Sequence, residues 1–219
     1  MKQQIMTSLE EKVDLRHTAL IVVDVQNDFC ADGGVFHKLG CDVTAVQEMV
    51  VRLAGFLEQA RSTRTLLVFV QGTYDDVYLS PVTVERRMAR NENVPLCISG
   101  SWGWEFYQIS PLPSEPVVRK HRYSAFVNTD LELILRSRGI KTLVICGVAT
   151  NVCIESTVRD GYMRDYYVVL LEDCTANYDI DLHKTTLRNV DKYFGQVCGS
   201  ADVIKAWKRT GHLEPRSPS

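Results

Sequence analysis

The stretch Thr18–Val25, TALIVVDV, decides the fold class, because a near-continuous apolar run of this length is typical of a strand buried on both faces of a parallel sheet. A helical pattern follows over residues 43–60, where Val46, Val50 and Leu53 recur at helical spacing. Strand and helix alternate in this way along the chain. This order predicts an α/β fold with a parallel sheet and helices on both of its faces.

The other expected elements continue the alternation. Strands are expected at residues 66–70, 116–118, 142–146, 167–171 and 196–197, and helices at 131–138, 151–164, 182–194 and 201–208. Since no repeat or linker divides the chain, we expect a single domain over residues 1–219, with an ordered core at about 12–210. The proline-containing stretch 72–114 shows little periodicity, and a connection of this length usually serves as a lid or a pocket wall.

Composition excludes several classes of partner. The 219 residues include 25 Lys and Arg against 27 Asp and Glu, so the net charge of −2 gives no support for binding to nucleic acid or to an acidic membrane. No apolar run reaches the ~20 residues that a membrane helix needs. The 7 cysteines lack metal-ligand spacing and are odd in number, which favours reduced thiols and a cytoplasmic location.

Three reactive residues follow three of the predicted strands. In a parallel sheet the carboxyl ends of the strands form the ligand site, and Asp24, Lys120 and Cys153 all lie at such ends. Each has a plainer interpretation: Asp24 as a helix cap or salt bridge, Lys120 as part of a solvated basic loop, and Cys153 as a core cysteine. Together, however, they supply the nucleophile, base and charged third group that covalent catalysis requires.

Cys153 has the most informative setting of the seven cysteines. A strand ends at Cys146, Gly147 permits a sharp turn, and Thr150 or Asn151 is expected to cap a helix that begins at Cys153. A helix N-terminus would lower the pKa of this thiol, and its free N–H groups would stabilise an oxyanion. Cys146 and Cys174 lie in or just after strands and are interpreted as core residues.

Three motifs carry a resemblance to a known family: ALIVVDVQNDF around Asp24, VVRKHRYSAF around Lys120 and GVATNVCIESTVRDG around Cys153. Through these motifs and their spacing, the chain resembles the isochorismatase-like cysteine hydrolases from about residue 18 to 208. Within that family it is similar to the ureidoacrylate amidohydrolases over residues 100–102, 120–140 and 147–161. The similarity to this subgroup does not extend over residues 72–93.

The resemblance implies a three-layer α-β-α fold around a central, mostly parallel sheet of about six strands, and a homodimer or homotetramer. It also implies a catalytic triad of Asp24, Lys120 and Cys153. A cis peptide between Val148 and Ala149 would place the N–H of Ala149 beside that of Cys153, and together they would form an oxyanion hole. The implied activity is hydrolysis of a C–N bond in a small amide or N-carbamoyl substrate through a thioester, with a ureidoacrylate-like substrate favoured.

Two branches of the family are separated by particular residues. Nicotinamidases carry a metal site built on an Asp-x-His motif after the second strand, but here that stretch holds Asp75 and Asp76 without a histidine, so we expect no metal and no cofactor. Isochorismatases that cleave a vinyl ether commonly lack the cysteine, so Cys153 favours amide hydrolysis. A vinyl-ether hydrolase and a catalytically idle binding protein on the same fold remain alternatives.

Several side chains are expected to bind the small-molecule substrate. We expect this of Gln26, Phe29, Tyr74, Trp102, Tyr123 and Asn151. Asn151 lies two residues before Cys153 and is suited to bond a ureido or amide group, although it fits a helix cap equally well. Tyr123 or Arg122 would meet a substrate carboxylate.

Overall fold

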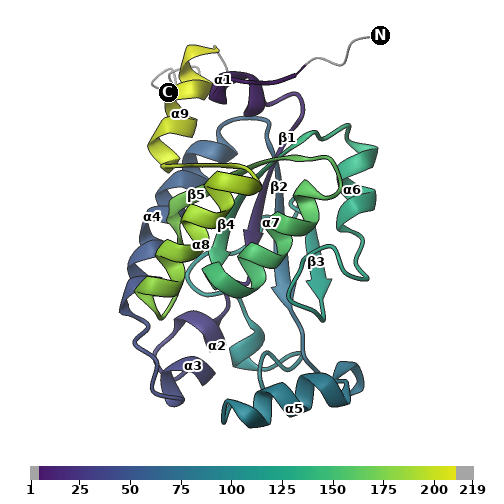
Figure 1. Ribbon diagram of the computed structural model, residues 1–219, viewed down its shortest axis with the longest axis vertical. Helices are drawn as coiled ribbons and strands as arrows, with labels where there is room; N and C mark the ends of the chain where they lie inside the picture. The colour runs from purple at the N-terminus through teal and green to yellow at the C-terminus, as the bar shows by residue number, and fades with distance from the viewer. Residues whose placement is uncertain (1–4, 211–219) are drawn as a thin grey trace.

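The computed structural model describes residues 5–210, in which a six-stranded parallel sheet lies between two layers of helices (Figure 1). The strands are β1 (Thr18–Val23), β2 (Leu66–Gly72), β3 (Val117–Lys120), β4 (Thr142–Val148), β5 (Tyr167–Ala176) and β6 (Gln196–Cys198). Their order is β3-β2-β1-β4-β5-β6, and all neighbouring pairs are parallel. The predicted fold class is therefore confirmed. The strand order reverses between β1 and β4, which is where an open parallel sheet forms a ligand crevice.

Helices cover both faces of the sheet, as Figure 1 shows. One face carries α6 (Leu131–Ser137), α7 (Glu155–Tyr162) and α8 (Ile180–Tyr193), and the other carries α4 (Thr44–Arg61) and α9 (Ser200–Arg209). Strand β1 contributes to both layers, because its side chains alternate between the faces. Leu20 belongs to the apolar cluster of α4 and α9, while Ile21 belongs to that of α6, α7 and α8.

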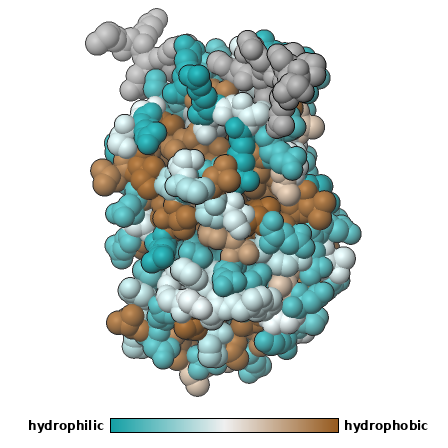
Figure 2. All heavy atoms as spheres, turned by 180° about the vertical axis from the view of Figure 1, so that it is seen from behind, coloured by the Kyte–Doolittle hydropathy of each residue, from teal (hydrophilic) through white to brown (hydrophobic). Residues whose placement is uncertain are grey.

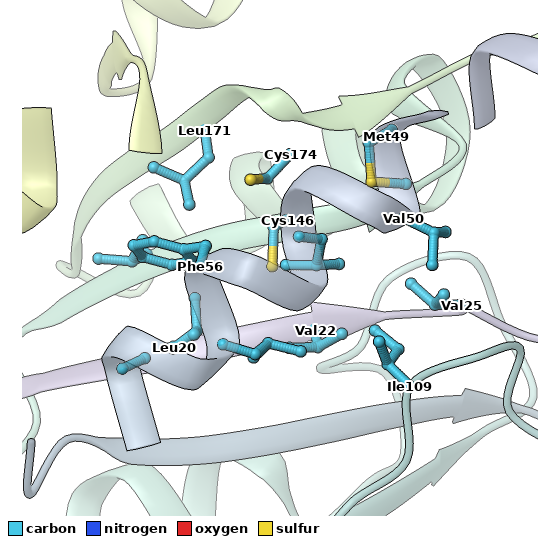
Figure 3. Close-up of a cluster of buried hydrophobic side chains, with 14 of the residues drawn as sticks. Leu20, Val22, Val25, Met49, Val50, Phe56, Ile109, Cys146, Leu171 and Cys174 are labelled. Atoms are coloured by element: carbon cyan, nitrogen blue, oxygen red, sulfur yellow. The ribbon is translucent and has the colours of Figure 1, made fainter. Parts of the chain in front are cut away.

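The cluster beneath α4 contains two of the cysteines. Cys146 and Cys174 lie among apolar side chains from α4 and the sheet, including Met49 and Phe56 (Figure 3). Both are fully buried. Their interpretation as core residues is confirmed, and burial raises the pKa of Cys174 to about 12.

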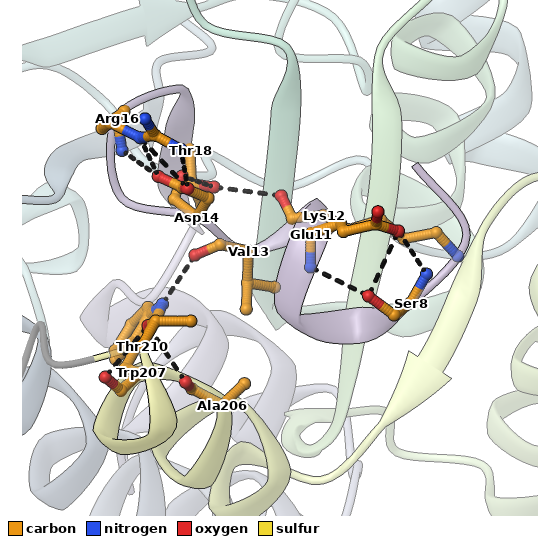
Figure 4. A network of polar contacts seen from close by, with 10 residues as sticks. All are labelled: Ser8, Glu11, Lys12, Val13, Asp14, Arg16, Thr18, Ala206, Trp207 and Thr210. Carbon is orange, nitrogen blue, oxygen red and sulfur yellow. Dashed lines mark hydrogen bonds and ion pairs between the residues drawn. The ribbon is translucent and has the colours of Figure 1, made fainter. Parts of the chain in front are cut away.

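The amino ends of the strands are closed by the two terminal helices. α1 (Leu9–Lys12) begins with a capping box, in which Ser8 and Glu11 satisfy each other's backbone N–H groups. The indole of Trp207 in α9 donates a hydrogen bond of 2.9 Å to the carbonyl of Val13 (Figure 4). The hydrogen bond between Trp207 and Val13 holds α9 against the chain that enters β1.

The stretch after β2 contains more regular structure than its sequence indicates. Residues 81–89 form α5 (Pro81–Ala89), with η1 (Asp76–Tyr78) before it and η2 (Trp102–Trp104) after it. Ser80 caps α5 by accepting a hydrogen bond from the N–H of Thr83, and Pro81 occupies the first turn. Figure 1 shows α5 together with α2 (Asn27–Cys30) and α3 (Val35–Lys38) at the carboxyl ends of the strands. The lid or pocket wall expected from this stretch thus has a helix at its centre.

The region after β4 also differs from the expected single helix over 151–164. A π-helical turn, η3 (Thr150–Ile154), precedes α7.

The surface in Figure 2 mixes hydrophobic with hydrophilic side chains. None of the helices in residues 5–210 is long and apolar enough to cross a membrane.

Candidate active site

Three strand ends bring Asp24, Lys120 and Cys153 into contact. Lys120 Nζ lies 2.8 Å from Asp24 Oδ2 and donates a hydrogen bond of 3.3 Å to Cys153 Sγ. Asp24 directly follows β1 and has a positive φ of 56°, so the chain turns out of the strand at that residue. Lys120 is the last residue of β3, and Cys153 lies in η3 just after β4. All three side chains are buried.

Lys120 is fully enclosed by polar partners. Besides Asp24 and Cys153, its ammonium donates to the hydroxyl of Tyr74 at 3.1 Å and to the carbonyl of Arg122 at 3.0 Å. Burial is the largest single effect and would lower the pKa of Lys120, but the neighbouring acidic groups, Asp24 foremost with Cys153 and Tyr74, together outweigh it, and the pKa lies well above its usual value. The solvated-loop interpretation of Lys120 is therefore wrong, and the site contains a permanent buried cation.

The Cys153 thiol keeps its proton in the resting site. Burial raises its pKa from the usual 9.0 to about 12, although the nearby Lys120 ammonium opposes this. The pKa lowering expected from a helix N-terminus is therefore wrong, because the thiol is only 5% exposed and lies in a π-helical turn. Burial also raises the pKa of Asp24, against the opposing effect of Lys120. The site thus combines a protonated thiol, a carboxylate and an ammonium.

The predicted helix caps before Cys153 are not formed. Ala149 occupies the N-cap position without a side-chain hydrogen bond, and Thr150 Oγ1 instead pairs with His183 Nδ1 at 2.8 Å. The Oδ1 atom of Asn151 is buried and has no hydrogen-bond partner among residues 5–210. The cis peptide between Val148 and Ala149 is present.

A cavity of about 540 Å³ opens onto Cys153. Four of the six side chains expected to bind substrate line it: Phe29, Tyr74, Tyr123 and Asn151. Ala149 also lines it, so both residues of the expected oxyanion hole border the same space.

Gln26 and Trp102 do not line this cavity. The Gln26 amide donates to the carbonyls of Gly72 at 3.0 Å and Trp104 at 2.8 Å, and accepts from the Gly72 N–H at 2.7 Å. It thereby joins the ends of β1 and β2 and has a structural role. Trp102 lies in η2 with its side chain half exposed.

Several lining residues escaped the sequence-based prediction. Arg87, Arg90 and Glu92 come from α5 and the turn after it, while Asn177 and Tyr178 follow β5. The Ser80-Pro81 pair, typical of a helix start, was the local signal for α5. Asn177 and Tyr178 were missed because β5 continues to Ala176, five residues beyond the expected end at Leu171. Within the described part of the chain, no three His, Cys, Asp or Glu side chains are grouped to hold a metal ion.

The comparison with known proteins identifies the family of the chain. The family model described as "Isochorismatase domain" matches residues 18–202. The chain belongs to the isochorismatase family. This confirms the resemblance inferred from the three motifs.

Relatives in this family include enzymes named ureidoacrylate amidohydrolase RutB. The one from Enterobacter sp. (strain 638) is 36% identical, over 87% of this chain and 89% of the relative. The one from Caulobacter vibrioides (strain ATCC 19089 / CIP 103742 / CB 15) is 37% identical, over 87% of this chain and 91% of the relative. A solved structure, described as a cysteine hydrolase from Pseudomonas syringae pv. phaseolicola 1448A, superimposes with a TM-score of 0.81. That structure is 26% identical, and the alignment covers 95% of this chain and 99% of the other.

Proposed function

We propose that the protein is a cysteine-dependent amidohydrolase that cleaves a C–N bond of a small amide or ureido substrate. The observation that carries this proposal is the buried contact of Cys153 Sγ with Lys120 Nζ at 3.3 Å, beside Asp24 and at the wall of a cavity of about 540 Å³. A nucleophile, a proton acceptor and a cation at one point form the set that covalent hydrolysis needs.

The reaction begins with transfer of the Cys153 proton to Asp24. The thiolate attacks the substrate carbonyl carbon, and the N–H groups of Ala149 and Cys153 hold the developing oxyanion. Protonated Asp24 then donates its proton to the leaving nitrogen as the C–N bond breaks. Water, deprotonated by Asp24, hydrolyses the resulting thioester and restores the thiol.

The electrostatics of the site suit both proton transfers. Burial disfavours the ionised forms of Cys153 and Asp24, so the resting thiol is not oxidised or alkylated readily, and protonated Asp24 is an accessible intermediate. The fixed charge of Lys120 stabilises whichever of the two groups is ionised. Lys120 is therefore assigned an electrostatic role.

A ureidoacrylate-like substrate is favoured because relatives that match most of the chain carry the name ureidoacrylate amidohydrolase. A vinyl-ether hydrolase would need an acid catalyst and no nucleophilic thiol. An idle binding protein would have no physical reason to keep three polar groups buried together, since burying them without a task is costly.

The test is ammonia release from a panel of ureidoacrylate, N-carbamoyl amino acids, biuret and nicotinamide. Ammonia that is released by the wild type and by Cys198→Ala, but not by Cys153→Ala, is the expected result. Cys198 is the matched control, because it is also a buried cysteine but lies in β6. Pyruvate release from isochorismate that survives Cys153→Ala would overturn the proposal in favour of the vinyl-ether reaction.

We further propose a cytoplasmic location and a homodimer or homotetramer. All seven cysteines are free thiols, which supports a reducing compartment. Exposed apolar side chains of Tyr162, Met163 and Tyr193 support contact between subunits. Light scattering after gel filtration gives the oligomeric state, and a monomeric mass would contradict it.

A further inference from the structure

Arg87 is a buried cation without a counter-charge. It lies in α5, is only 7% exposed and lines the cavity that contains Cys153. Its guanidinium carbon lies 5.2 Å from the centre of the Tyr74 ring. No carboxylate among the described residues forms an ion pair with it. Its side chain has no hydrogen-bond partner among them either, yet its nitrogens are not among the fully enclosed unpartnered atoms, so its N–H groups are open to the cavity.

The other charged side chains that line this cavity have partners. Arg90 forms an ion pair of 2.7 Å with Glu92. Asp179 caps α8 by accepting hydrogen bonds from the N–H groups of Asp181 and Leu182. Of these four charged side chains, Arg87 is the one without an ion-pair or hydrogen-bond partner among the described residues, and a buried charge of this kind is costly unless a ligand pairs with it.

The position of Arg87 relative to the reacting atoms is set by Tyr74. The Tyr74 hydroxyl accepts a hydrogen bond from Lys120 Nζ, which in turn contacts Cys153 Sγ. The Tyr74 ring is thus close to both cations, since Lys120 Nζ lies 5.6 Å and the Arg87 guanidinium carbon 5.2 Å from its centre. A small molecule whose carbonyl carbon lies at Cys153 can place a group at its other end against Arg87.

We propose that Arg87 binds the carboxylate of the substrate, so that the substrates of this site are ureido or amido acids and neutral amides are disfavoured. A guanidinium matches a carboxylate geometrically and bonds it in a bidentate manner. This inference rests on the proposed amidohydrolase function, to which it adds the substrate class. Arg122, the arginine expected from the sequence to meet a carboxylate, instead donates to the backbone carbonyls of Tyr78 and His121.

Asn151 supplies a second recognition point. Its buried, unpartnered Oδ1 lines the same cavity and is free to accept a hydrogen bond from a ureido N–H. In the proposed complex, Arg87 binds the carboxylate by charge and Asn151 binds the ureido group through a neutral hydrogen bond, since both residues line the one cavity.

The kinetic test compares ureidoacrylate with its methyl ester, in which the charge is masked. In Arg87→Met, KM for the acid is expected to rise about 10- to 100-fold, because a charge-assisted bond is lost, while kcat changes little. The preference of kcat/KM for the acid over the ester is expected to disappear. Arg86→Met is the matched control, since Arg86 is the neighbouring residue of α5 but is exposed and lies outside the cavity.

Three results would overturn the inference. They are an unchanged acid-over-ester preference in Arg87→Met, an equal loss for acid and ester, and a KM effect that follows Arg90→Met alone. Circular dichroism and the unfolding midpoint show whether Arg87→Met is folded, and a midpoint at or above that of the wild type is expected because a buried unpaired charge is removed.

A binding measurement separates this inference from the proposed function. Calorimetry with ureidoacrylate is performed on Cys153→Ala with and without Arg87→Met. If the wild type releases no ammonia but binding still depends on Arg87, the hydrolase proposal fails and the carboxylate site stands. If ammonia is released and binding is independent of Arg87, the carboxylate site fails and the hydrolase proposal stands.

Discussion

Lys120 Nζ lies 2.8 Å from Asp24 Oδ2, and the two side chains are 0% and 1% exposed. An ion pair in this setting contributes little net stability, since desolvation offsets much of the attraction between the charges. Each partner nevertheless depends on the other, because a single buried charge is far more costly than a pair. The pair therefore supports the chemistry of Cys153 more than the stability of the fold.

The first prediction concerns the dependence of the buried Lys120 ammonium on the negative charge of Asp24. Asp24→Asn leaves the Lys120 ammonium buried without its counter-charge, so the free energy of unfolding is expected to fall by about 3–5 kcal/mol. Activity is expected to be abolished, because the proton acceptor for Cys153 is lost. Urea unfolding and ammonia release measure the two effects.

The control is the double variant Asp24→Asn with Lys120→Met. Removing the orphaned charge is expected to recover at least half of the lost stability without any recovery of activity. Stability losses that simply add in the double variant would show that the two groups do not interact in the folded protein.

The second prediction is a pH dependence that comes from Cys153. Its pKa rises from 9.0 to about 12 on folding because the thiol is buried, so the folded state binds this proton more tightly than the unfolded state. The resulting stability is fully present below about pH 9 and is lost between pH 9 and 12, by at most about 1.4 kcal/mol per pH unit.

This contribution is isolated by comparison with Cys153→Ala. The difference in free energy of unfolding between the two proteins is expected to be constant from about pH 7 to 8.5 and then to fall as the pH rises. A difference that is flat to pH 11, or that grows, would mean that the thiol is not held in its protonated form.

The third prediction concerns the close contact between Gly103 and the side chain of Asp28. A Cβ at Gly103 would collide with the carboxylate of Asp28, which accepts hydrogen bonds from the N–H groups of Cys97 at 2.7 Å and Val35 at 3.3 Å. Gly103→Ala is therefore expected to lower the free energy of unfolding by about 2–4 kcal/mol. Gly55 is the matched control.

Gly55 lies in the middle of α4 with nothing within 4 Å of an added Cβ. Gly55→Ala is expected to raise the free energy of unfolding by up to about 1 kcal/mol, because alanine favours the helix more than glycine does. Similar effects from both substitutions would show that the Gly103–Asp28 contact does not constrain the chain.

The features that the sequence predicted correctly are those with a strong local pattern. The run at Thr18–Val23 is buried on both faces, and its composition follows directly from that burial. Because the strands are parallel, the residues after them, Asp24, Lys120 and Cys153, had to lie at one edge of the sheet.

The features that escaped prediction depend on tertiary contacts. The only buried side chain of α5 is that of Arg87, which is not apolar. The sequence of this segment therefore shows no hydrophobic periodicity from which a helix could be predicted. Gln26 lies just after a strand, where substrate-binding residues are expected in a parallel sheet. Its side-chain amide instead donates hydrogen bonds to backbone carbonyls 46 and 78 residues away in the sequence. The pKa of Cys153 is set by burial from several elements, which overrides the local effect of a helix start.

The central claim is that Cys153 becomes covalently attached to the substrate. The most direct measurement is mass spectrometry of the protein, acid-quenched during turnover of ureidoacrylate, followed by peptide mapping. The account predicts a substrate-derived acyl or carbamoyl group on the peptide containing Cys153, and no such group in Cys153→Ala. Full turnover without any adduct on Cys153, or turnover that persists in Cys153→Ala, would contradict it.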